Sequence, residues 1–248
     1  MHRLVARLLL GVTLLIGLPL GALGLYWLAT FPDVESLTRT NPTTTALIDA
    51  RTADAAVNGK PVTVQRTWVP LSKIARHLQQ AVIVSEDASF YQHEGFDWNG
   101  LKDAAQRDWQ QGTFSRGGST ITQQLAKNLY LSPDKSLVRK AREALITRAL
   151  EHHLRKARIL ELYLNVVEWG RGVYGVEAAA RHHFHKSAAE LSAEEAAILA
   201  AMLPSPRRYD PLRMTPYLTK RQHQILQLME RQTAHPLSPS GNGGASAD

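Results

Sequence analysis

An apolar run without a charged side chain, residues 8–30, most constrains how this 248-residue chain can fold. As a helix it would span roughly 34 Å at about 1.5 Å per residue, enough to cross a hydrocarbon layer of about 30 Å. Arg3 and Arg7 precede the run, and Tyr26 and Trp27 lie near its far end, where interfacial aromatic residues are common. We therefore expect an N-terminal transmembrane helix with its start in the cytoplasm and the rest of the chain exported.

A cleaved signal peptide is the alternative reading of this run. Its apolar core would normally cover about 7–15 residues before a small-residue cleavage site. The run here is longer and ends on an aromatic pair, so an uncleaved anchor is favoured. The length then suits one domain plus the anchor.

Charge and cysteine content limit the partners and the chemistry. The net charge of +7 suits anionic partners such as phosphates, nucleic acid or an acidic membrane surface. The cations are spread along the chain, and an exported domain would not normally meet nucleic acid, so we expect no nucleic-acid partner. Cysteine is absent, which excludes disulfides, thiolate nucleophiles and cysteine-type zinc sites.

The pattern along the chain predicts a mostly α fold with a small β-hairpin region. Asn58-Gly59, in a stretch rich in Thr and Val, is typical of a hairpin, so short strands are expected on either side. From residue 71 onward, helical patterns dominate. Helices are expected to begin near Thr120 and Leu137, to cover 156–165 and 217–231, and to run from the capping box at Ser192 to about Leu203.

These signals divide the chain into five parts. The tail is rich in Pro, Ser and Gly and has little to bury, so it is expected to be disordered. The expected parts are a cytoplasmic N-terminus (1–7), a transmembrane anchor (8–30), a juxtamembrane linker (31–42), a folded domain (43–234) and the disordered tail (235–248).

Glu86 continues an apolar helical stripe. Four-residue steps from Ile74 through Leu78 and Val82 end on this carboxylate, which places it at the edge of the core or in a cleft. Partial desolvation there would raise its pKa toward that of a useful general base. The competing interpretation is an ordinary exposed Glu-Asp pair, with Asp87, at the end of a helix.

A glycine-rich turn, residues 117–120, leads into a helix with a polar face. Thr120 and Gln123 match a capping box, and the helix N-terminus would offer free N–H groups and positive dipole character. Gln123 and Lys127 share one face, as do Gln124 and Asn128. This arrangement suits an anion such as a phosphate, although a capped surface helix is an equally good interpretation.

Arg139, Lys140 and Glu143 have the spacing of ion pairs on one helix. Spacing alone favours a structural salt-bridge ladder. Two other patterns are rejected as sites. Ser132 to Lys135 matches a four-residue nucleophile motif but lacks its companion motifs, and the adjacent histidines at 152–153 and 182–185 face apart on helices.

Four ordered motifs together resemble monofunctional peptidoglycan glycosyltransferases, relatives of the glycosyltransferase domain of class A penicillin-binding proteins. The resemblance covers about residues 69–211. It rests on Glu86, Asp87, Phe90, His93, Gly95 and Asp97; on 117–128; on Arg139, Lys140 and Glu143; and on 158–165 with Gly170, Gly172, Tyr174 and Gly175.

The resemblance implies a lysozyme-like domain that polymerises lipid II into β-1,4 glycan strands for cell-wall biogenesis. Undecaprenyl diphosphate would leave with inversion at the sugar, on the periplasmic side of a single-pass inner-membrane protein. A small hydrophobic lobe would enter the bilayer, drawing on Trp98, Leu101, Trp109 and Phe114. The expected partners are lipid II, the growing glycan strand and the membrane, with divisome or elongation proteins and transpeptidases as further candidates.

The resemblance also assigns roles to residues. Glu86 would be the general base, Lys127 would stabilise the departing diphosphate with Lys135 and Arg139 nearby, and Glu143 would orient donor or metal groups. Substrate would be held by Asp87, Phe90, His93, Ser119, Thr120, Gln123, Gln124 and Asn128. No covalent cofactor is expected, while Mg²⁺ or Mn²⁺ is compatible with the diphosphate.

Two positions depart from the family pattern. Lys135 stands where an arginine is usual, which keeps the charge but loses the bidentate fork. His183 stands where an aromatic residue is common. Two other functions stay open at this point: a hydrolase or lytic transglycosylase that cleaves glycan, and a non-catalytic scaffold.

Overall fold

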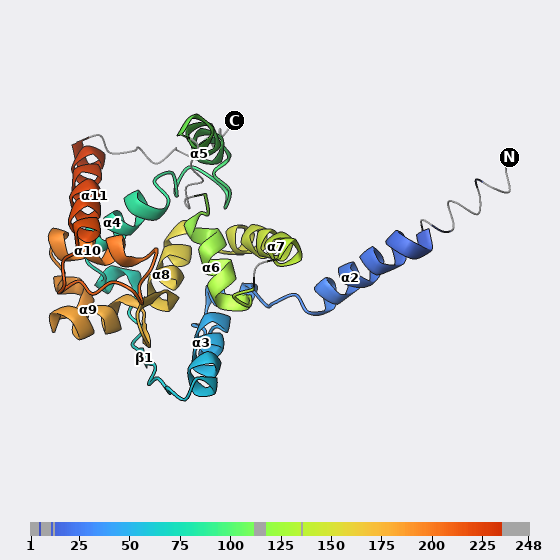
Figure 1. Ribbon diagram of the computed structural model, residues 1–248, viewed down its shortest axis with the longest axis horizontal. Coiled ribbons are helices and arrows are strands. Elements are labelled where there is room, and N and C mark those ends of the chain that lie inside the picture. The colour runs from blue at the N-terminus through green and yellow to red at the C-terminus, as the bar shows by residue number, and fades with distance from the viewer. Residues whose placement is uncertain (1–4, 6–10, 12, 112–117, 135, 235–248) are drawn as a thin grey trace, which may run out of the picture.

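The computed structural model describes residues 5, 11, 13–111, 118–134 and 136–234. These residues are mostly helical, as predicted, and include one small sheet (Figure 1). The α-helices are α2 (Leu18–Ala29), α3 (Ala46–Val57), α4 (Arg76–Glu86), α5 (Trp98–Gln111), α6 (Ile121–Tyr130), α7 (Leu137–His153), α8 (Lys156–Val166), α9 (Val176–Phe184), α10 (Ala193–Met202) and α11 (Pro216–Ala234). The short helical turns are η1 (Thr13–Gly17), η2 (Glu35–Thr38), η3 (Leu71–Lys73) and η4 (Ala188–Glu190), and the strands are β1 (Gln65–Arg66), β2 (Glu168–Gly170) and β3 (Val173–Tyr174).

The predicted helix starts are confirmed by their caps. At α6 the Thr120 hydroxyl accepts from the Gln123 N–H at 3.2 Å, and Gln123 Oε1 accepts from the Thr120 N–H at 3.0 Å. Ser192 and Glu195 form the same reciprocal pair at α10. Such pairs satisfy N–H groups that the helix itself leaves without partners.

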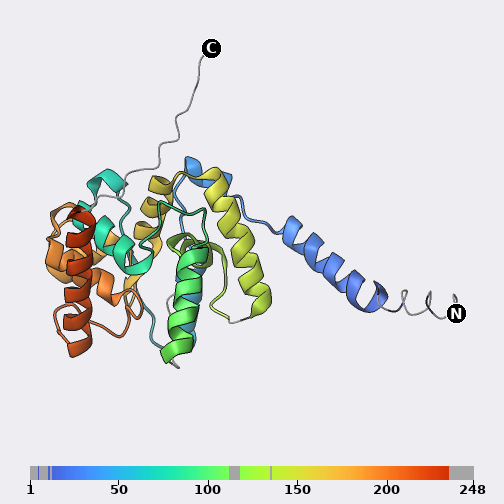
Figure 2. The same cartoon turned by 90° about the horizontal axis from the view of Figure 1, so that it is seen from above.

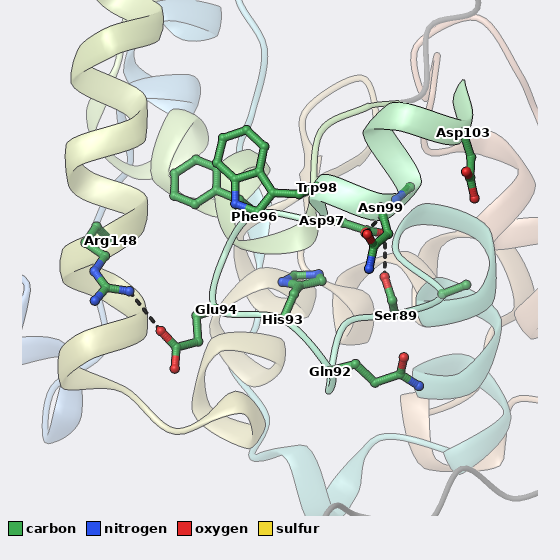
Figure 3. Close-up of a pocket in the computed structure, with 12 residues that line it drawn as sticks. Ser89, Gln92, His93, Glu94, Phe96, Asp97, Trp98, Asn99, Asp103 and Arg148 are labelled. Atoms are coloured by element: carbon green, nitrogen blue, oxygen red, sulfur yellow. Dashed lines mark hydrogen bonds and ion pairs between the residues drawn. The ribbon is translucent and has the colours of Figure 1, made fainter. Parts of the chain in front are cut away.

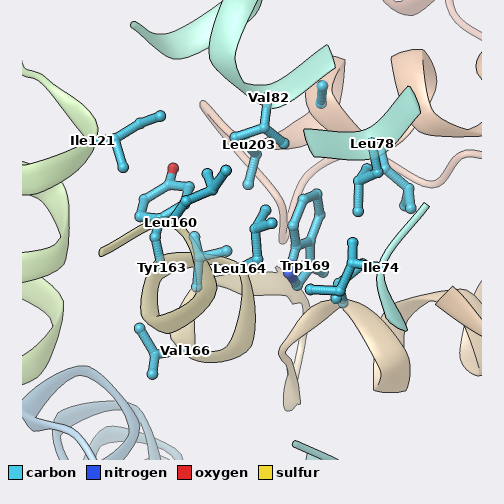
Figure 4. Close-up of a cluster of buried hydrophobic side chains, with 14 of the residues drawn as sticks. Ile74, Leu78, Val82, Ile121, Leu160, Tyr163, Leu164, Val166, Trp169 and Leu203 are labelled. Atoms are coloured by element: carbon cyan, nitrogen blue, oxygen red, sulfur yellow. The ribbon is translucent and has the colours of Figure 1, made fainter. Parts of the chain in front are cut away.

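The core lies where two groups of helices meet (Figure 4). Helix α10 packs against α4 and α11, while α6 packs against α7 and α8. Leu78, Val82, Leu160 and Trp169 are fully buried in this cluster. Burying a large apolar side chain contributes roughly 1.5–3 kcal/mol. The four-residue spacing therefore marks the inner face of α4 correctly, even though Ile74 lies just before the helix.

The hairpin predicted at Asn58-Gly59 is wrong. These residues end helix α3, with Gly59 in the left-handed region at φ +63°. The Lys60 N–H donates to Ala55 O at 2.9 Å and the Gly59 N–H to Ala56 O at 3.1 Å, a pattern that closes a helix C-terminus. A glycine at positive φ serves both a hairpin turn and a helix end, so the dipeptide alone could not decide between them.

The small sheet has the order β1-β3-β2, and of the two short strands expected beside Asn58-Gly59 only the later one is present, as β1. Strand β3 pairs antiparallel with β2 and parallel with β1. Gly175 follows β3 at φ +79°, and a Cβ at this position would lie 2.8 Å from Asn165 O. The fourth motif therefore needs glycine here because the backbone of α8 approaches closely.

Polar residues of the fourth motif hold the preceding segment against α8. Asn165 Oδ1 accepts from the Val69 N–H at 2.9 Å, and Glu161 Oε2 accepts from the Leu71 N–H at 2.9 Å. Arg158 pairs with Glu161 and donates to Leu37 O and Thr40 O, which fixes the linker before α3. This motif therefore positions the entry to α4, at whose end Glu86 lies.

Helix α2 extends away from the helical body (Figures 1 and 2). Its junction with the body is held by Arg142 of α7, which donates to Thr30 O at 2.6 Å and stacks over the Tyr26 ring at 5.7 Å. Within the part of the chain that the structure describes, no helix combines the length and apolar character required to cross a membrane.

Candidate functional site

Glu86 is the last residue of α4 and lies half-buried in a cavity of about 280 Å³. Burial raises the pKa of its carboxyl, and hydrogen bonds from Gln124 and Ser85 oppose part of that rise. A carboxylate with a raised pKa in a cavity is suited to accept a proton near neutral pH. The cavity is lined by Val84, Ser85, Glu86, Asp87, Ala88, Asp97, Gly100, Leu101, Gly118, Ser119 and Thr120.

Glu86 is held by groups from two other helices. Gln124 Nε2 of α6 donates to Glu86 Oε2 at 2.8 Å. Arg221 of α11 donates to Ser85 O at 3.1 Å, and its charge lowers the Glu86 pKa. The Glu86 carboxylate in the cavity wall therefore has a donor at each oxygen: Gln124 at Oε2 and, at 3.3 Å, the Ser85 hydroxyl at Oε1.

Asp87 has a different role from its neighbour. It is buried, with Oδ1 at 2.8 Å from His93 Nε2 and Oδ2 accepting from the Ile121 N–H at 2.9 Å. The Gly95 N–H donates to His93 Nδ1, so His93 Nε2 carries the proton given to Asp87. Asp87 and His93 therefore join the ends of α4 and α6 and the loop between α4 and α5.

The expected free N–H groups at the start of α6 are largely occupied, which corrects the anion-site prediction. The Ile121 N–H donates to Asp87, the Thr120 N–H to Gln123, and the Gln123 N–H to Thr120. The carboxylate of Asp87 already meets the positive end of the helix dipole. An anion here would have to be met by side-chain cations.

Such cations gather around Glu143 on α7. Glu143 is 2 % exposed and receives Arg139 Nη1 at 2.8 Å together with Lys140 Nζ. The predicted salt-bridge ladder is therefore present, and Lys140 also reaches Ser119 Oγ at 3.5 Å. The ladder fixes two cations beside the glycine turn of the second motif.

Lys127 of α6 completes this cluster. Its side chain reaches solvent, but the surrounding walls desolvate it and lower the pKa of the ammonium. The negative charge of Glu143 opposes that shift, and the charges of Arg139 and Lys140 reinforce it. Glu86 also acts on Lys127 through its charge, so the acid and the ammonium belong to one electrostatic site.

A second cavity, of about 260 Å³, is lined by both Gln124 and Lys127. Glu168 in its wall is buried and receives Arg51 Nε of α3 at 3.2 Å, while burial raises the pKa of the Glu168 carboxyl. Gln124 thus bonds to Glu86 and lines the Lys127 cavity. The lining residues are Leu47, Arg51, Gln124, Lys127, Asn128, Leu131, Pro133, Val167, Glu168, Leu203, Pro204 and Pro206.

A third and larger cavity, of about 860 Å³, adjoins the Glu86 cavity and shares Ala88, Asp97 and Gly100 with it (Figure 3). Phe96 and Trp98 stack in its wall with ring centroids 5.5 Å apart, and Asp97 accepts from Ser89. The Glu86 cavity thus adjoins the largest of the three cavities, and Gln124, which bonds to Glu86, lines the smallest.

The predicted substrate residues differ in how far they are engaged by other parts of the protein. Ser119, Gln124 and Asn128 line the Glu86 or Lys127 cavity. Asp87, His93, Thr120 and Gln123 are tied up in hydrogen bonds that hold the site together. Phe90 is fully buried, with Lys156 Nζ 4.6 Å from its ring centroid, so the ring offers no exposed surface for contact with substrate in this structure.

Lys135, Phe114 and the Trp109 side chain lie outside the described residues, whereas Trp98 and Leu101 are exposed on α5. His183 is buried and its Nε2 lies 3.1 Å from Trp169 O, so it fits the core in place of an aromatic residue.

Sequence reasoning assigned no role to three residues that the structure brings to the site: Lys140, Tyr163 and Arg221. Lys140 could have been found because it belongs to the third motif. Tyr163 reaches the site from α8 and lies within the fourth motif, which could have drawn attention to it, whereas Arg221 of α11 lies outside the four motifs.

Comparison with known proteins identifies the family. A model described as "Transglycosylase" matches residues 54–230. A biosynthetic peptidoglycan transglycosylase of Dechloromonas aromatica is 51% identical over 170 residues, 68% of this chain and 74% of that protein. Proteins of the same name from Nitrosospira multiformis (48% identical; 75% and 81% covered) and Paraburkholderia xenovorans (44%; 82% and 86%) are also similar. The chain therefore belongs to the transglycosylase family and is an enzyme of that class.

Proposed function

We propose that this chain is a peptidoglycan glycosyltransferase that polymerises lipid II into β-1,4 glycan strands. The observation that carries the proposal is that a desolvated carboxylate and an ammonium lie in one site. Gln124 donates to the carboxylate of Glu86 and lines the same cavity as the ammonium of Lys127. A base and an anion-stabilising cation are what glycosyl transfer from a lipid diphosphate requires. The related proteins carry the name of the same activity.

In the proposed reaction Glu86 removes the proton from the GlcNAc 4-hydroxyl of the acceptor. The oxygen attacks C1 of the lipid-linked sugar of the growing strand, the C1–O bond to the diphosphate breaks, and undecaprenyl diphosphate leaves with the bonding electrons. Attack from the face opposite the leaving group inverts the α-linked sugar to a β-1,4 product.

The cavities suggest where each substrate binds. The acceptor would occupy the Glu86 cavity and the adjoining larger cavity, where the Phe96–Trp98 stack can pack against a sugar. The growing strand would place its diphosphate near Lys127, Lys140 and Arg139. Glu143 acts as a positioning residue here, since its carboxylate oxygens are bonded to two of those cations.

A divalent cation is not given a role in this mechanism. Among the described residues, no group of three potential metal ligands comes together. Glu143, the carboxylate closest to the cations, is already paired. Any Mg²⁺ or Mn²⁺ would therefore depend on ligands from the substrate diphosphate.

We further propose that residues 8–30 anchor the chain in the inner membrane with the catalytic domain on the periplasmic side. The uncharged run, the preceding arginines and the exposed apolar side chains of α2 support this. Trp98 and Leu101 on α5 are also exposed and would meet the lipid surface. Divisome or elongation proteins and transpeptidases remain proposed partners.

A lipid II polymerisation assay with purified full-length chain tests the function. We expect glycan product from the wild type and none from Glu86→Gln. Finished glycan serves as the second substrate, because a hydrolase or lytic transglycosylase would consume it. Cleavage of finished glycan without use of lipid II would refute the proposal, as would unchanged synthesis by Glu86→Gln.

A further inference from the structure

Tyr163 on α8 connects the core to the proposed base through one intermediate side chain. It is fully buried, and its hydroxyl donates to Gln124 Oε1 at 3.0 Å. Gln124 Nε2 then donates to Glu86 Oε2 at 2.8 Å. The three side chains form a continuous series of hydrogen bonds that ends on the carboxylate.

This series fixes which way the Gln124 amide points. The buried hydroxyl proton of Tyr163 needs an acceptor, and Gln124 Oε1 provides it. With the amide reversed, Gln124 Oε1 would face the Glu86 carboxylate, so two acceptors would meet and the Tyr163 proton would lose its partner. A carboxylate cannot donate when ionised, so the reversed amide would disfavour the charged form of Glu86.

We propose that Tyr163 is a positioning residue whose hydroxyl holds the Gln124 amide with its donor toward Glu86. The proposal rests on the proposed role of Glu86 as base and extends it, because it names the group that favours the ionised form of the Glu86 carboxylate. Tyr163 contacts Gln124 rather than the reacting atoms, so its effect on the reaction is indirect.

The other charges around Glu86 do not reproduce this effect. Arg221 of α11 lowers the Glu86 pKa and Asp87 raises it, and both remain when Tyr163 loses its hydroxyl. Lys127 of α6 interacts with Glu86 as well. Helix α10 also packs against α4, and its carboxylates, Glu194 and Glu195, are bonded to Ser192 and Lys186.

Tyr163→Phe removes the hydroxyl and leaves the ring in the core. Because the Gln124 donor lowers the Glu86 pKa, loss of its fixed orientation should raise that pKa further. The acidic limb of the kcat/KM profile should then move to higher pH. We expect a loss of about tenfold on the acidic side that shrinks toward alkaline pH, the size associated with losing a hydrogen bond to a charged group.

One control variant and one double-mutant comparison accompany this experiment. Tyr174→Phe removes another buried tyrosine hydroxyl, from a residue whose charged neighbours are Glu168, Arg51 and Arg207, and should leave the acidic limb in place. In a Gln124→Ala background, Tyr163→Phe should no longer move the limb, because the amide that transmits the effect is gone. A uniform loss of activity at all pH values, or a shift that persists without Gln124, would overturn the proposal.

A measurement without turnover separates this proposal from the proposed function. The Glu86 carboxyl carbon is titrated by ¹³C NMR in the full-length chain in detergent, and Tyr163→Phe should move its midpoint upward whether or not Glu86 is the catalytic base. In the wild-type chain, which needs no variant to fold, the Gln124 side-chain ¹⁵N resonance should follow the Glu86 titration. A Gln124 resonance that ignores Glu86 would overturn the proposal.

Discussion

The buried ladder on α7 gives a sharp stability prediction. Glu143 is 2 % exposed, and its two oxygens receive Arg139 and Lys140, whose side chains are 18% and 47% exposed. Glu143→Gln leaves these cations, together with nearby Lys127, without their shared counter-charge. Breaking a buried ion pair costs roughly 3–5 kcal/mol, and the solvent access of Lys140 favours the lower end.

We therefore expect Glu143→Gln to destabilise the domain by about 3 kcal/mol, or roughly 6–12 °C in Tm for a domain of this size. Thermal unfolding of the full-length chain in detergent, followed by circular dichroism, measures the change. The α7 helix supplies a matched control, the exposed pair between Arg148 and Glu94 at 2.9 Å. Glu94→Gln should cost less than about 1 kcal/mol.

The comparison between the two variants decides the outcome. Equal shifts in Tm for Glu143→Gln and Glu94→Gln would show that burial adds nothing to the ladder. The interpretation of Glu143 as the residue that fixes the cations would then be refuted.

Three further predictions concern single residues. Lys127→Ala should lower kcat in the lipid II assay by about 10²–10³-fold, as expected when an electrostatic stabiliser of the transition state is removed; a twofold change would contradict its role. Gly95→Ala should destabilise by more than Gly59→Ala in thermal unfolding, because both have positive φ but only a Cβ at Gly95 would meet the Thr147 side chain, at 2.7 Å. Because burial raises the folded-state pKa of Glu86, folding loses stability as pH rises from its unfolded toward its folded pKa. Glu86→Gln should therefore stabilise the fold at neutral pH, and denaturant titrations should show this gain vanish at acidic pH; a gain at acidic pH alone would contradict the sign.

Local sequence signals predicted α6, α7, α8, α10 and α11 and the position of the proposed base, but not α3. The capping boxes at Thr120 and Ser192 involve residues three apart, so the sequence contains the whole interaction. The stripe through Leu78 and Val82 placed Glu86 at the edge of the core for the same reason. These predictions needed no knowledge of how distant segments meet.

Long-range contacts account for what the sequence could not predict. The Ile121 N–H of α6 is occupied because Asp87, 34 residues earlier in the chain, accepts from it. Gln124 is oriented by Tyr163 from α8, and Arg221 reaches the first motif from α11. Tyr163 belongs to the fourth motif, but its partner could not be read from the sequence, and Arg221 lies outside the motifs; both contacts depend on how α8 and α11 pack.

The structure also distinguishes the proposed base, Glu86, from the carboxylate next to it. Asp87 is committed to His93 and to the N-terminus of α6, where its charge is met by N–H donors. Its repulsion is therefore the weakest of the influences on the Glu86 pKa, and desolvation is the strongest. Both residues line the cavity, but both oxygens of Asp87 are engaged in bonds that hold the fold, whereas Glu86 accepts only from the Gln124 amide and, at 3.3 Å, from the Ser85 hydroxyl. This division of the pair depends on the start of α6 lying against the end of α4, so the helix cap supports the proposed mechanism.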